Sequence, residues 1–157
     1  LREQVAAHGG DPNKIYLMGQ SAGAVHVGGY IAREHSPSRD GWSPAGAILV
    51  SGLFNIHTMD RNPLYDSYFG AETVQGDRPF LGQLASSNVP LLVVTAELDP
   101  VDFLRQNVAL LDAYLRHHQR LPHYVHLSGH NHLSTVQHLN TAEESLARPL
   151  LRFMGRD

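Results

Sequence analysis

The amino-acid sequence predicts an α/β fold in which a mostly parallel β-sheet carries helices on both faces. Two observations lead to this prediction. Short apolar runs rich in β-branched or large aliphatic residues have the length of strands, and they span residues 14–18, 47–50, 91–95 and 124–127. Segments with helical character lie between or after these runs, and strands that alternate with helices form right-handed crossovers in a parallel sheet.

The first helix and the central strand have distinct compositions. Residues 22–33 are rich in Ala and Gly, so we expect a helix that packs closely against the sheet. Residues 91–94 are continuously apolar, as expected of a strand covered on both faces. The stretch 54–90 has no clear period, and its aromatic residues include Tyr65, Tyr68, Phe69 and Phe80. It forms either a lid or pocket wall over the sheet, or an ordinary connection with short helices.

Two further helices are predicted from the spacing of their apolar residues. In residues 101–118, steps of four, three and four residues align one apolar face, which consists of Leu104, Val108, Leu111 and Leu115. Residues 142–154 carry acidic side chains early and arginines late, which suits the helix dipole. We expect Leu146, Leu150 and Met154 to lie on one side of this last helix.

Composition limits the classes of function. The chain has 157 residues, of which 42% are hydrophobic and 17% charged, so it suits one globular domain with a real core. The net charge is -3 and no basic block stands out, which argues against nucleic acid as a partner. No apolar run approaches the length of a membrane span. The absence of cysteine excludes disulfides and thiol nucleophiles. It also permits a cytoplasmic location without establishing it, and this is the location that we favour.

The most informative motif follows the first strand and reads Gly19-Gln20-Ser21-Ala22-Gly23, a G-x-S-x-G pattern between a strand and a helix. This arrangement presents a serine oxygen on a tight, strained turn, where it can attack a carbonyl carbon. We expect side chains at Gly19 and Gly23 to clash with neighbouring chain. The alternative role for Ser21 is to cap the helix that follows it.

Two later strand ends carry the partners that a serine nucleophile needs. A serine hydroxyl requires a base, and a carboxylate holds that base in the correct tautomer. The third strand runs into an acidic segment in which Asp99 is the preferred acid, with Glu97 and Asp102 as alternatives. A second role for Asp99 is to cap the helix that follows it. After the fourth strand, His132 is the preferred base, and His130 is interpreted as a surface or supporting residue.

These motifs resemble those of α/β-hydrolase carboxylesterases. Residues 9–24 resemble the nucleophile region of this family, residues 97–100 its acid loop, and residues 129–134 its histidine loop. Residues 51–54, with the sequence Ser-Gly-Leu-Phe, match a segment that often lines the pocket. The resemblance covers most of the chain, and its motifs occur in the order serine, acid, histidine.

The resemblance implies a serine carboxylic-ester hydrolase that forms an acyl-enzyme and needs no cofactor or metal. Carried over by position, it assigns Ser21 as nucleophile, Asp99 as acid and His132 as base. The backbone N–H of Ala22 would supply one donor of the oxyanion hole, because it follows the nucleophile. Metal binding is not expected, since the eleven histidines include no H-E-x-x-H motif and no paired His–Cys spacing.

The same resemblance places Gln20, Leu53 and Phe54 at a substrate pocket, which we expect to accept small or aromatic esters. Two other functions are left open. An arylformamidase-type amide hydrolase would use the same three catalytic residues. A catalytically silent hydrolase-fold module would instead use its surface to bind partners.

One departure from the family concerns its amino-terminal strands. The family opens with several strands and a His-Gly-Gly-Gly-like loop that supplies part of the oxyanion hole, and neither occurs before the G-x-S-x-G motif. We therefore expect residues 1–157 to be the carboxy-terminal part of a single α/β-hydrolase domain, with the missing amino-terminal part as its partner. A homo-oligomer is left open.

Overall fold

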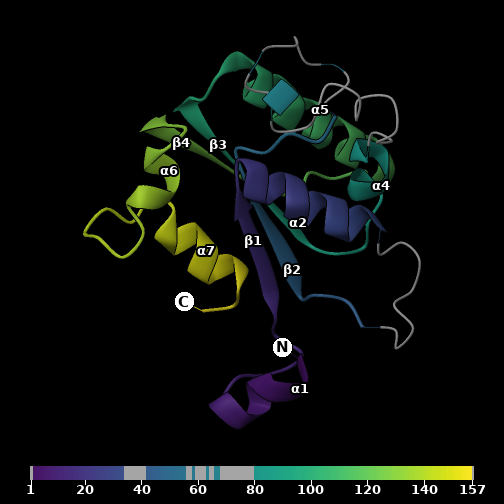
Figure 1. Ribbon diagram of the computed structural model, residues 1–157, viewed down its shortest axis with the longest axis vertical. Coiled ribbons are helices and arrows are strands. Elements are labelled where there is room, and N and C mark those ends of the chain that lie inside the picture. Colours follow the sequence, from purple (N-terminus) through teal and green to yellow (C-terminus); the bar gives the residue numbers. More distant parts are fainter. Residues whose placement is uncertain are drawn as a thin grey trace.

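A computed structural model of the chain describes residues 2–33, 42–55, 58, 63, 66–67 and 80–156 (Figure 1). Its centre is a four-stranded sheet in the order β1-β2-β3-β4, and each pair of neighbouring strands is parallel. The strands are β1 (Tyr16–Gln20), β2 (Gly46–Val50), β3 (Leu91–Leu98) and β4 (His123–Asn131). The predicted parallel sheet is confirmed, and β1, β3 and β4 continue beyond their predicted carboxyl ends.

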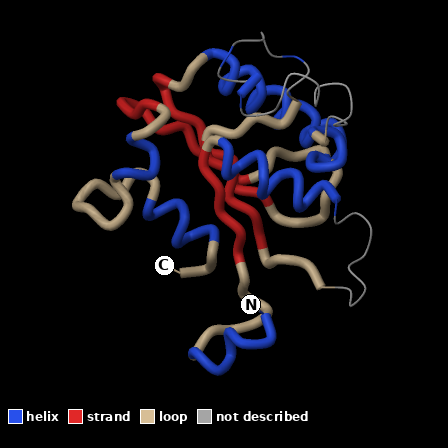
Figure 2. The backbone as a smooth tube through the Cα atoms, viewed as in Figure 1, coloured by secondary structure: helices blue, strands red, loops and turns tan. Residues whose placement is uncertain are grey.

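Helices connect and cover these strands, as Figure 2 shows in blue around the red sheet. The described helices are α1 (Arg2–Val5), the 3-10 helix η1 (Ala6–His8), α2 (Ala22–Arg33), α4 (Leu81–Ala85), α5 (Val101–His118), α6 (Ser134–Gln137) and α7 (Ala147–Phe153). The predicted bounds of α2 and α5 are confirmed. None of the described helices has the length and apolar character that a membrane crossing requires.

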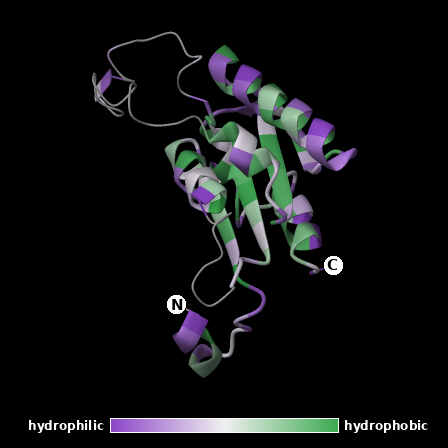
Figure 3. Ribbon diagram, turned by 90° about the vertical axis from the view of Figure 1, so that its right-hand side faces the viewer, coloured by the Kyte–Doolittle hydropathy of each residue, from purple (hydrophilic) through white to green (hydrophobic). Residues whose placement is uncertain are grey.

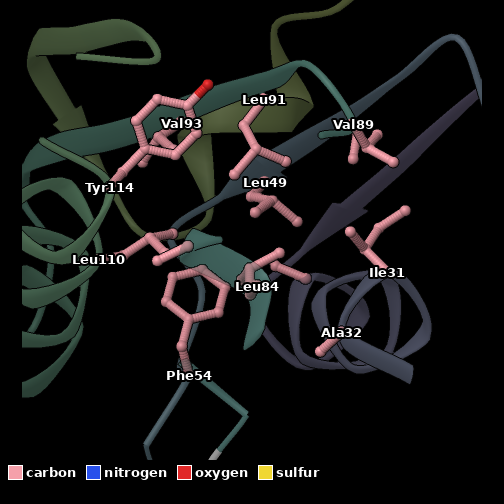
Figure 4. Close-up of a cluster of buried hydrophobic side chains, with 13 residues drawn as sticks. Ile31, Ala32, Leu49, Phe54, Leu84, Val89, Leu91, Val93, Leu110 and Tyr114 are labelled. Carbon is pink, nitrogen blue, oxygen red and sulfur yellow. The ribbon is translucent and has the colours of Figure 1, made fainter. Parts of the chain in front are cut away.

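The two faces of the sheet bury separate apolar clusters, because successive residues of a strand point to opposite faces. One cluster joins α2, α4 and α5 to the sheet, and Figure 4 shows its large members Ile31, Leu49, Phe54, Leu84, Leu91, Val93, Leu110 and Tyr114. The other cluster lies against α7 and consists of Ile48, Val50, Leu92, Val94, Leu127, Leu146 and Leu150. Burial on both faces explains why the central strands are uniformly apolar (Figure 3).

Helix α5 has the predicted bounds but buries a different face. Of the predicted face, Val108 is 64% exposed and Leu115 is 44% exposed. The buried residues of α5 are Phe103, Gln106, Asn107, Leu110 and Tyr114. The predicted face was wrong at Val108 and Leu115, whereas Leu111 packs against the core. The error arises because hydrophobic spacing assigns polar residues such as Gln106 and Asn107 to the solvent side.

The two buried amides of α5 bind the backbone of the segment that follows β2. Gln106 Oε1 accepts hydrogen bonds from the N–H groups of Phe54 and Asn55, at 3.0 and 2.6 Å. Asn107 Nδ2 donates to the Gly52 carbonyl oxygen at 3.0 Å. Buried backbone groups need such partners, so these amides hold the segment against the helix and are buried with it.

Helix α7 begins at Ala147, later than the predicted start at residue 142. Pro149 explains the difference, because proline lacks an N–H group and is tolerated only in the first turn of a helix. An earlier start would place Pro149 in the helix interior. The predicted apolar side is confirmed, since Leu146 and Leu150 are 2% and 7% exposed and Met154 packs against the same cluster.

The stretch between β2 and β3 is described only in part. Tyr65, Tyr68 and Phe69 lie outside the described residues, so the choice between a lid and an ordinary connection stays a prediction. Phe80 is described, and its ring centroid lies 6.4 Å from that of Phe54 in an edge-on contact. This contact anchors the end of the stretch in the core beside α2 and α4.

Candidate active site

Four polar side chains stand at the carboxyl ends of the four strands. Each is the first residue after its strand: Ser21 follows β1, Ser51 follows β2, Asp99 follows β3 and His132 follows β4. Parallel strands bring their carboxyl ends to one edge of a sheet, which is where open α/β folds place reactive groups. The sheet therefore gathers residues that are far apart in the sequence.

Ser21 occupies a strained turn between β1 and α2. Its φ of 55° lies in the left-handed region, which is uncommon for residues other than glycine. The Ser21 N–H donates to the Val50 carbonyl at 2.9 Å, and the Ser21 carbonyl accepts from the Ala24 N–H at 3.0 Å. These bonds to a neighbouring strand and to the following helix hold the turn in its strained conformation.

Glycine is required at one end of this turn. A Cβ atom on Gly19 would overlap the carbonyl group of Gly23 and lie 2.6 Å from the Ala24 nitrogen. A Cβ atom on Gly23 would meet no described atom within 4 Å. The steric prediction is confirmed for Gly19. It is wrong for Gly23 within the described part of the chain, because a Cβ there would point into open space.

Ser21, His132 and Asp99 form a continuous hydrogen-bonded chain. Ser21 Oγ lies 2.8 Å from His132 Nε2, and His132 Nδ1 lies 2.8 Å from Asp99 Oδ1. The Asp99 side chain is fully buried, whereas the His132 side chain is 20% exposed. A carboxylate beside Nδ1 keeps the proton on that nitrogen, so Nε2 is free to accept a proton from the serine hydroxyl.

The surroundings of Asp99 favour its ionised form. Burial raises the pKa of Asp99, but hydrogen bonds from His132, the Ala96 N–H and the Ser51 hydroxyl outweigh it and leave the pKa below its ordinary value. The Ala96 nitrogen and Ser51 Oγ donate to Asp99 Oδ2 at 2.8 and 2.7 Å. Asp99 is therefore a carboxylate at neutral pH and can hold the imidazole in place.

We expect the stability that Asp99 contributes to the folded protein to be lost in acid. Because its folded-state pKa is lowered, Asp99 contributes stability that is complete above the ordinary value of 3.8 and is lost as the pH falls through the folded-state pKa. Urea melts between about pH 5 and pH 3 should show a smaller acid-induced loss of unfolding free energy for Asp99→Asn than for the unchanged protein. Equal losses in the two proteins would contradict this expectation.

Ser51 is a supporting residue that sequence reasoning missed. It is fully buried, its φ is 48°, and its hydroxyl donates to Asp99 Oδ2 at 2.7 Å. Its N–H donates to the Val94 carbonyl at 2.8 Å, which ties the end of β2 to β3. Its signals in the sequence were its position at the end of an apolar strand and its place in the segment 51–54 that resembles a pocket lining, and neither reveals the contact with Asp99.

Ser51→Ala should destabilise the folded protein by about 1.5–3 kcal/mol, the range for a buried hydrogen bond to a charged group. Chemical denaturation at neutral pH measures this difference. Ser86→Ala is the control, because the Ser86 hydroxyl bonds to the Gln83 carbonyl at an exposed position. The interpretation of Ser51 would be wrong if the two variants were equally stable.

Three contacts position the loop that carries His132, between β4 and α6. Gln20 Nε2 and Thr135 Oγ1 donate to the His132 carbonyl oxygen at 2.7 and 3.0 Å. The Phe103 ring packs against the imidazole, with ring centroids 4.3 Å apart. Gln20 therefore ties the histidine loop to β1, and its place in a substrate pocket stays a prediction.

The other predicted site residues lie near the nucleophile turn or inside the core. Ala22 is the first residue of α2, so its N–H is one of those that the helix leaves without a partner of its own. Leu53 is 3% exposed and Phe54 is fully buried. Both side chains are buried in the hydrophobic core, and their role as pocket walls stays a prediction.

The two carboxylates considered as alternatives to Asp99 make other contacts. Glu97 Oε2 accepts a hydrogen bond from the Gly129 N–H at 2.7 Å. Asp102 lies 3.5 Å from Arg105 in an exposed ion pair on α5. Of the three acids, Asp99 is thus the one that the structure brings to His132.

His130 is buried, so of the two roles expected for it, surface or supporting residue, the surface role is wrong. Its exposed fraction is 7%, and its ring nitrogens lie 3.3 Å from Ser134 Oγ and 3.1 Å from Ser145 Oγ. Gly129 has a φ of 75°, and the pairing of β4 with β3 is irregular at this point. The alternation of β4 is therefore interrupted just before His130, which turns that side chain inward.

Comparison with solved structures places this fold among known ones. The chain superimposes on carboxyl esterase 2 of the mycorrhizal fungus Tuber melanosporum with a TM-score of 0.64 and 16% identity, over 99% of this chain and 57% of that one. The match to an esterase/lipase from an uncultured bacterium has a TM-score of 0.62 and 17% identity, over 98% and 56%. The fold is the α/β-hydrolase fold. A further match is acylaminoacyl peptidase of Pyrococcus horikoshii, with a TM-score of 0.69 and 13% identity, over 98% of this chain and 26% of that one.

Comparison by sequence gives a shorter match. No protein-family model matches the chain. Among curated proteins, it is similar to a probable isoprenylcysteine α-carbonyl methylesterase of Oryza sativa subsp. japonica, with 42% identity over 65 residues, which is 36% of this chain and 16% of that protein. The chain spans less than two thirds of the length of each of these relatives.

Proposed function

We propose that the chain carries the catalytic residues of a serine carboxylic-ester hydrolase, with Ser21 as nucleophile, His132 as base and Asp99 as acid. The observation that carries this proposal is the pair of 2.8 Å contacts that joins Ser21 Oγ through the imidazole to Asp99. A serine oxygen becomes an effective nucleophile only when an oriented base lies within hydrogen-bond reach. The esterases among the solved neighbours support the same reaction class.

Acylation begins when Ser21 Oγ attacks the ester carbonyl carbon and transfers its proton to His132 Nε2. The new carbon–oxygen bond gives a tetrahedral intermediate with a negative oxygen, and the imidazolium is stabilised by the Asp99 carboxylate. His132 then gives the proton to the alkoxy oxygen as the carbon–oxygen bond to the alcohol breaks. The product is an acyl ester on Ser21, and the alcohol leaves.

Deacylation repeats these steps with water. His132 Nε2 takes a proton from a water molecule, whose oxygen attacks the acyl carbon, and the proton returns to Ser21 Oγ as the acid is released. The N–H of Ala22, at the positive end of α2, would donate to the intermediate's oxygen in both steps. Removing one such donor costs on the order of 100- to 1,000-fold in rate in measured cases.

We propose small or aromatic esters as the substrate class. The support comes from similar proteins that are an arylesterase, a carboxyl esterase and a probable methylesterase. The acylaminoacyl peptidase neighbour instead supports cleavage of an amide bond, the bond type that the arylformamidase alternative requires. Turnover of short p-nitrophenyl esters, compared with turnover of N-formyl-kynurenine, separates these two hydrolases. Absence of both activities favours a catalytically silent binding module.

His132→Ala should reduce ester turnover by several orders of magnitude, because the serine then has no base. The comparison is kcat/KM for a short p-nitrophenyl ester. His117→Ala is the matched control, since it removes an exposed imidazole near the end of α5, and it should retain the activity of the unchanged protein. Equal activities of the two variants would rule out His132 as the base.

A further inference from the structure

A second group of ionisable side chains lies beside the histidine loop, outside the Ser21–His132–Asp99 chain. It consists of His130 near the end of β4, His138 directly after α6, and Glu143 between α6 and α7. Each residue offers one ligand atom, and these atoms all lie within 4.8 Å of one another. Segments on both sides of α6 therefore converge on one point.

The Glu143 carboxylate is oriented toward both imidazoles. The Ser145 N–H donates to Glu143 Oε1 at 2.8 Å and fixes the carboxylate. Glu143 Oε2 is buried and accepts no hydrogen bond from the described residues. It lies 3.6 Å from His130 Nε2 and 3.6 Å from His138 Nδ1, which is longer than a hydrogen bond. A buried carboxylate oxygen without a donor needs an explanation.

The His130 ring is held so that its Nε2 atom faces the Glu143 carboxylate. Its side chain is 9% exposed, and Ser134 Oγ lies 3.3 Å from Nδ1. If the Nδ1 proton is donated to Ser134, Nε2 carries the lone pair, as in metal-binding histidines fixed by a hydrogen bond on the other nitrogen. Ser145 Oγ lies 3.1 Å from Nε2, and its hydroxyl can rotate away when a stronger partner binds.

The distances and charges suit a small divalent cation. Zinc bonds of about 2.0–2.2 Å place neighbouring ligand atoms of a tetrahedron about 3.4 Å apart. The two nitrogen–oxygen separations of 3.6 Å are close to this value, and the half-exposed His138 side chain has room to adjust. The Ser145 N–H bonds Glu143 Oε1, so Oε2 is the carboxylate oxygen available to a cation.

We propose that His130, His138 and Glu143 form a binding site for a divalent transition-metal ion of the zinc class. Two imidazole nitrogens and one carboxylate oxygen are ligands that zinc accepts, with water in the fourth position. The bound ion joins the end of β4 to the segment before α7, and so it braces the loop that carries His132. Binding of the ion to the folded state alone also stabilises the protein.

Zinc titration of the untagged protein tests this site. Isothermal titration calorimetry should give one Zn²⁺ per chain, and added Zn²⁺ should raise the melting temperature. Glu143→Gln and His138→Ala should each weaken zinc binding by more than the roughly 10- to 100-fold that loss of an outer-shell partner costs. Both should also lose the zinc-dependent rise in melting temperature.

Two control variants separate this site from general binding by histidines and acids. Glu144→Gln changes the adjacent carboxylate, which pairs with Arg148, and His117→Ala removes an exposed imidazole of α5. Both should bind Zn²⁺ like the unchanged protein, and circular dichroism confirms that each variant is folded. The proposal is overturned if the unchanged protein binds no Zn²⁺, or if folded Glu143→Gln or His138→Ala binds it with unchanged affinity.

Discussion

Ser21→Ala is expected to lower ester turnover by several orders of magnitude, on the order of a million-fold if chemistry limits the rate. The reason is that Ser21 Oγ is the described hydroxyl oxygen within hydrogen-bond reach of His132 Nε2. Without that oxygen, the imidazole has no nucleophile to deprotonate. The measurement is kcat and KM for a short p-nitrophenyl ester. The expected loss is in kcat, because the hydroxyl acts in the chemical step more than in substrate binding.

The Ser21→Ala variant should remain folded, which makes the loss interpretable. The bonds that hold the turn are backbone bonds, from the Ser21 N–H to Val50 and from Ala24 to the Ser21 carbonyl, and alanine keeps both. Circular dichroism and a thermal melt check this point. A folded variant that retained about a tenth of the activity or more would exclude Ser21 as the nucleophile.

Gly19→Ala is expected to destabilise the protein by about 3 kcal/mol or more, because the added methyl group meets backbone that cannot yield. Its Cβ would overlap the Gly23 carbonyl group and lie 2.6 Å from the Ala24 nitrogen. To relieve the overlap, β1 and α2 would have to separate, which would also displace Ser21 from His132. Urea denaturation gives the stability, and ester turnover reports the displacement.

Gly82→Ala is the matched control for this substitution. Gly82 lies in the exposed part of α4, and a Cβ there meets no described atom within 4 Å. Alanine has a higher helix propensity than glycine, so Gly82→Ala should leave the stability unchanged or raise it by up to about 1 kcal/mol. If Gly19→Ala were as stable as Gly82→Ala, the close packing of the turn would be refuted.

The sequence predicted the order and type of the main elements because their signals are local. Apolar runs marked the strands, and the Gly–Ser–Gly turn marked the start of α2. The boundary at Ala147 does not follow from apolar spacing, because it depends on Pro149, which is tolerated only in the first turn of α7. The buried face of α5 could not be found by spacing, since Gln106 and Asn107 are buried through bonds to the segment after β2.

The sequence also placed Ser21, Asp99 and His132 at strand ends, because the strand-end rule needs only topology. What it could not provide were contacts between side chains from different strands. The bond from Ser51 to Asp99 and the bond from Gln20 to the His132 carbonyl depend on the sheet order. The inward turn of His130 depends on the irregularity of β4 at Gly129, which alternation alone does not predict.

The most direct test of the central claim is the site at which a fluorophosphonate probe reacts. The probe phosphonylates a serine oxygen only when a neighbouring base activates it. Peptide mass spectrometry of the labelled protein should find one adduct, on Ser21, and His132→Ala should suppress its formation. A protein that turns over esters while Ser21 stays unmodified, or that carries the adduct on a different serine, would contradict the account.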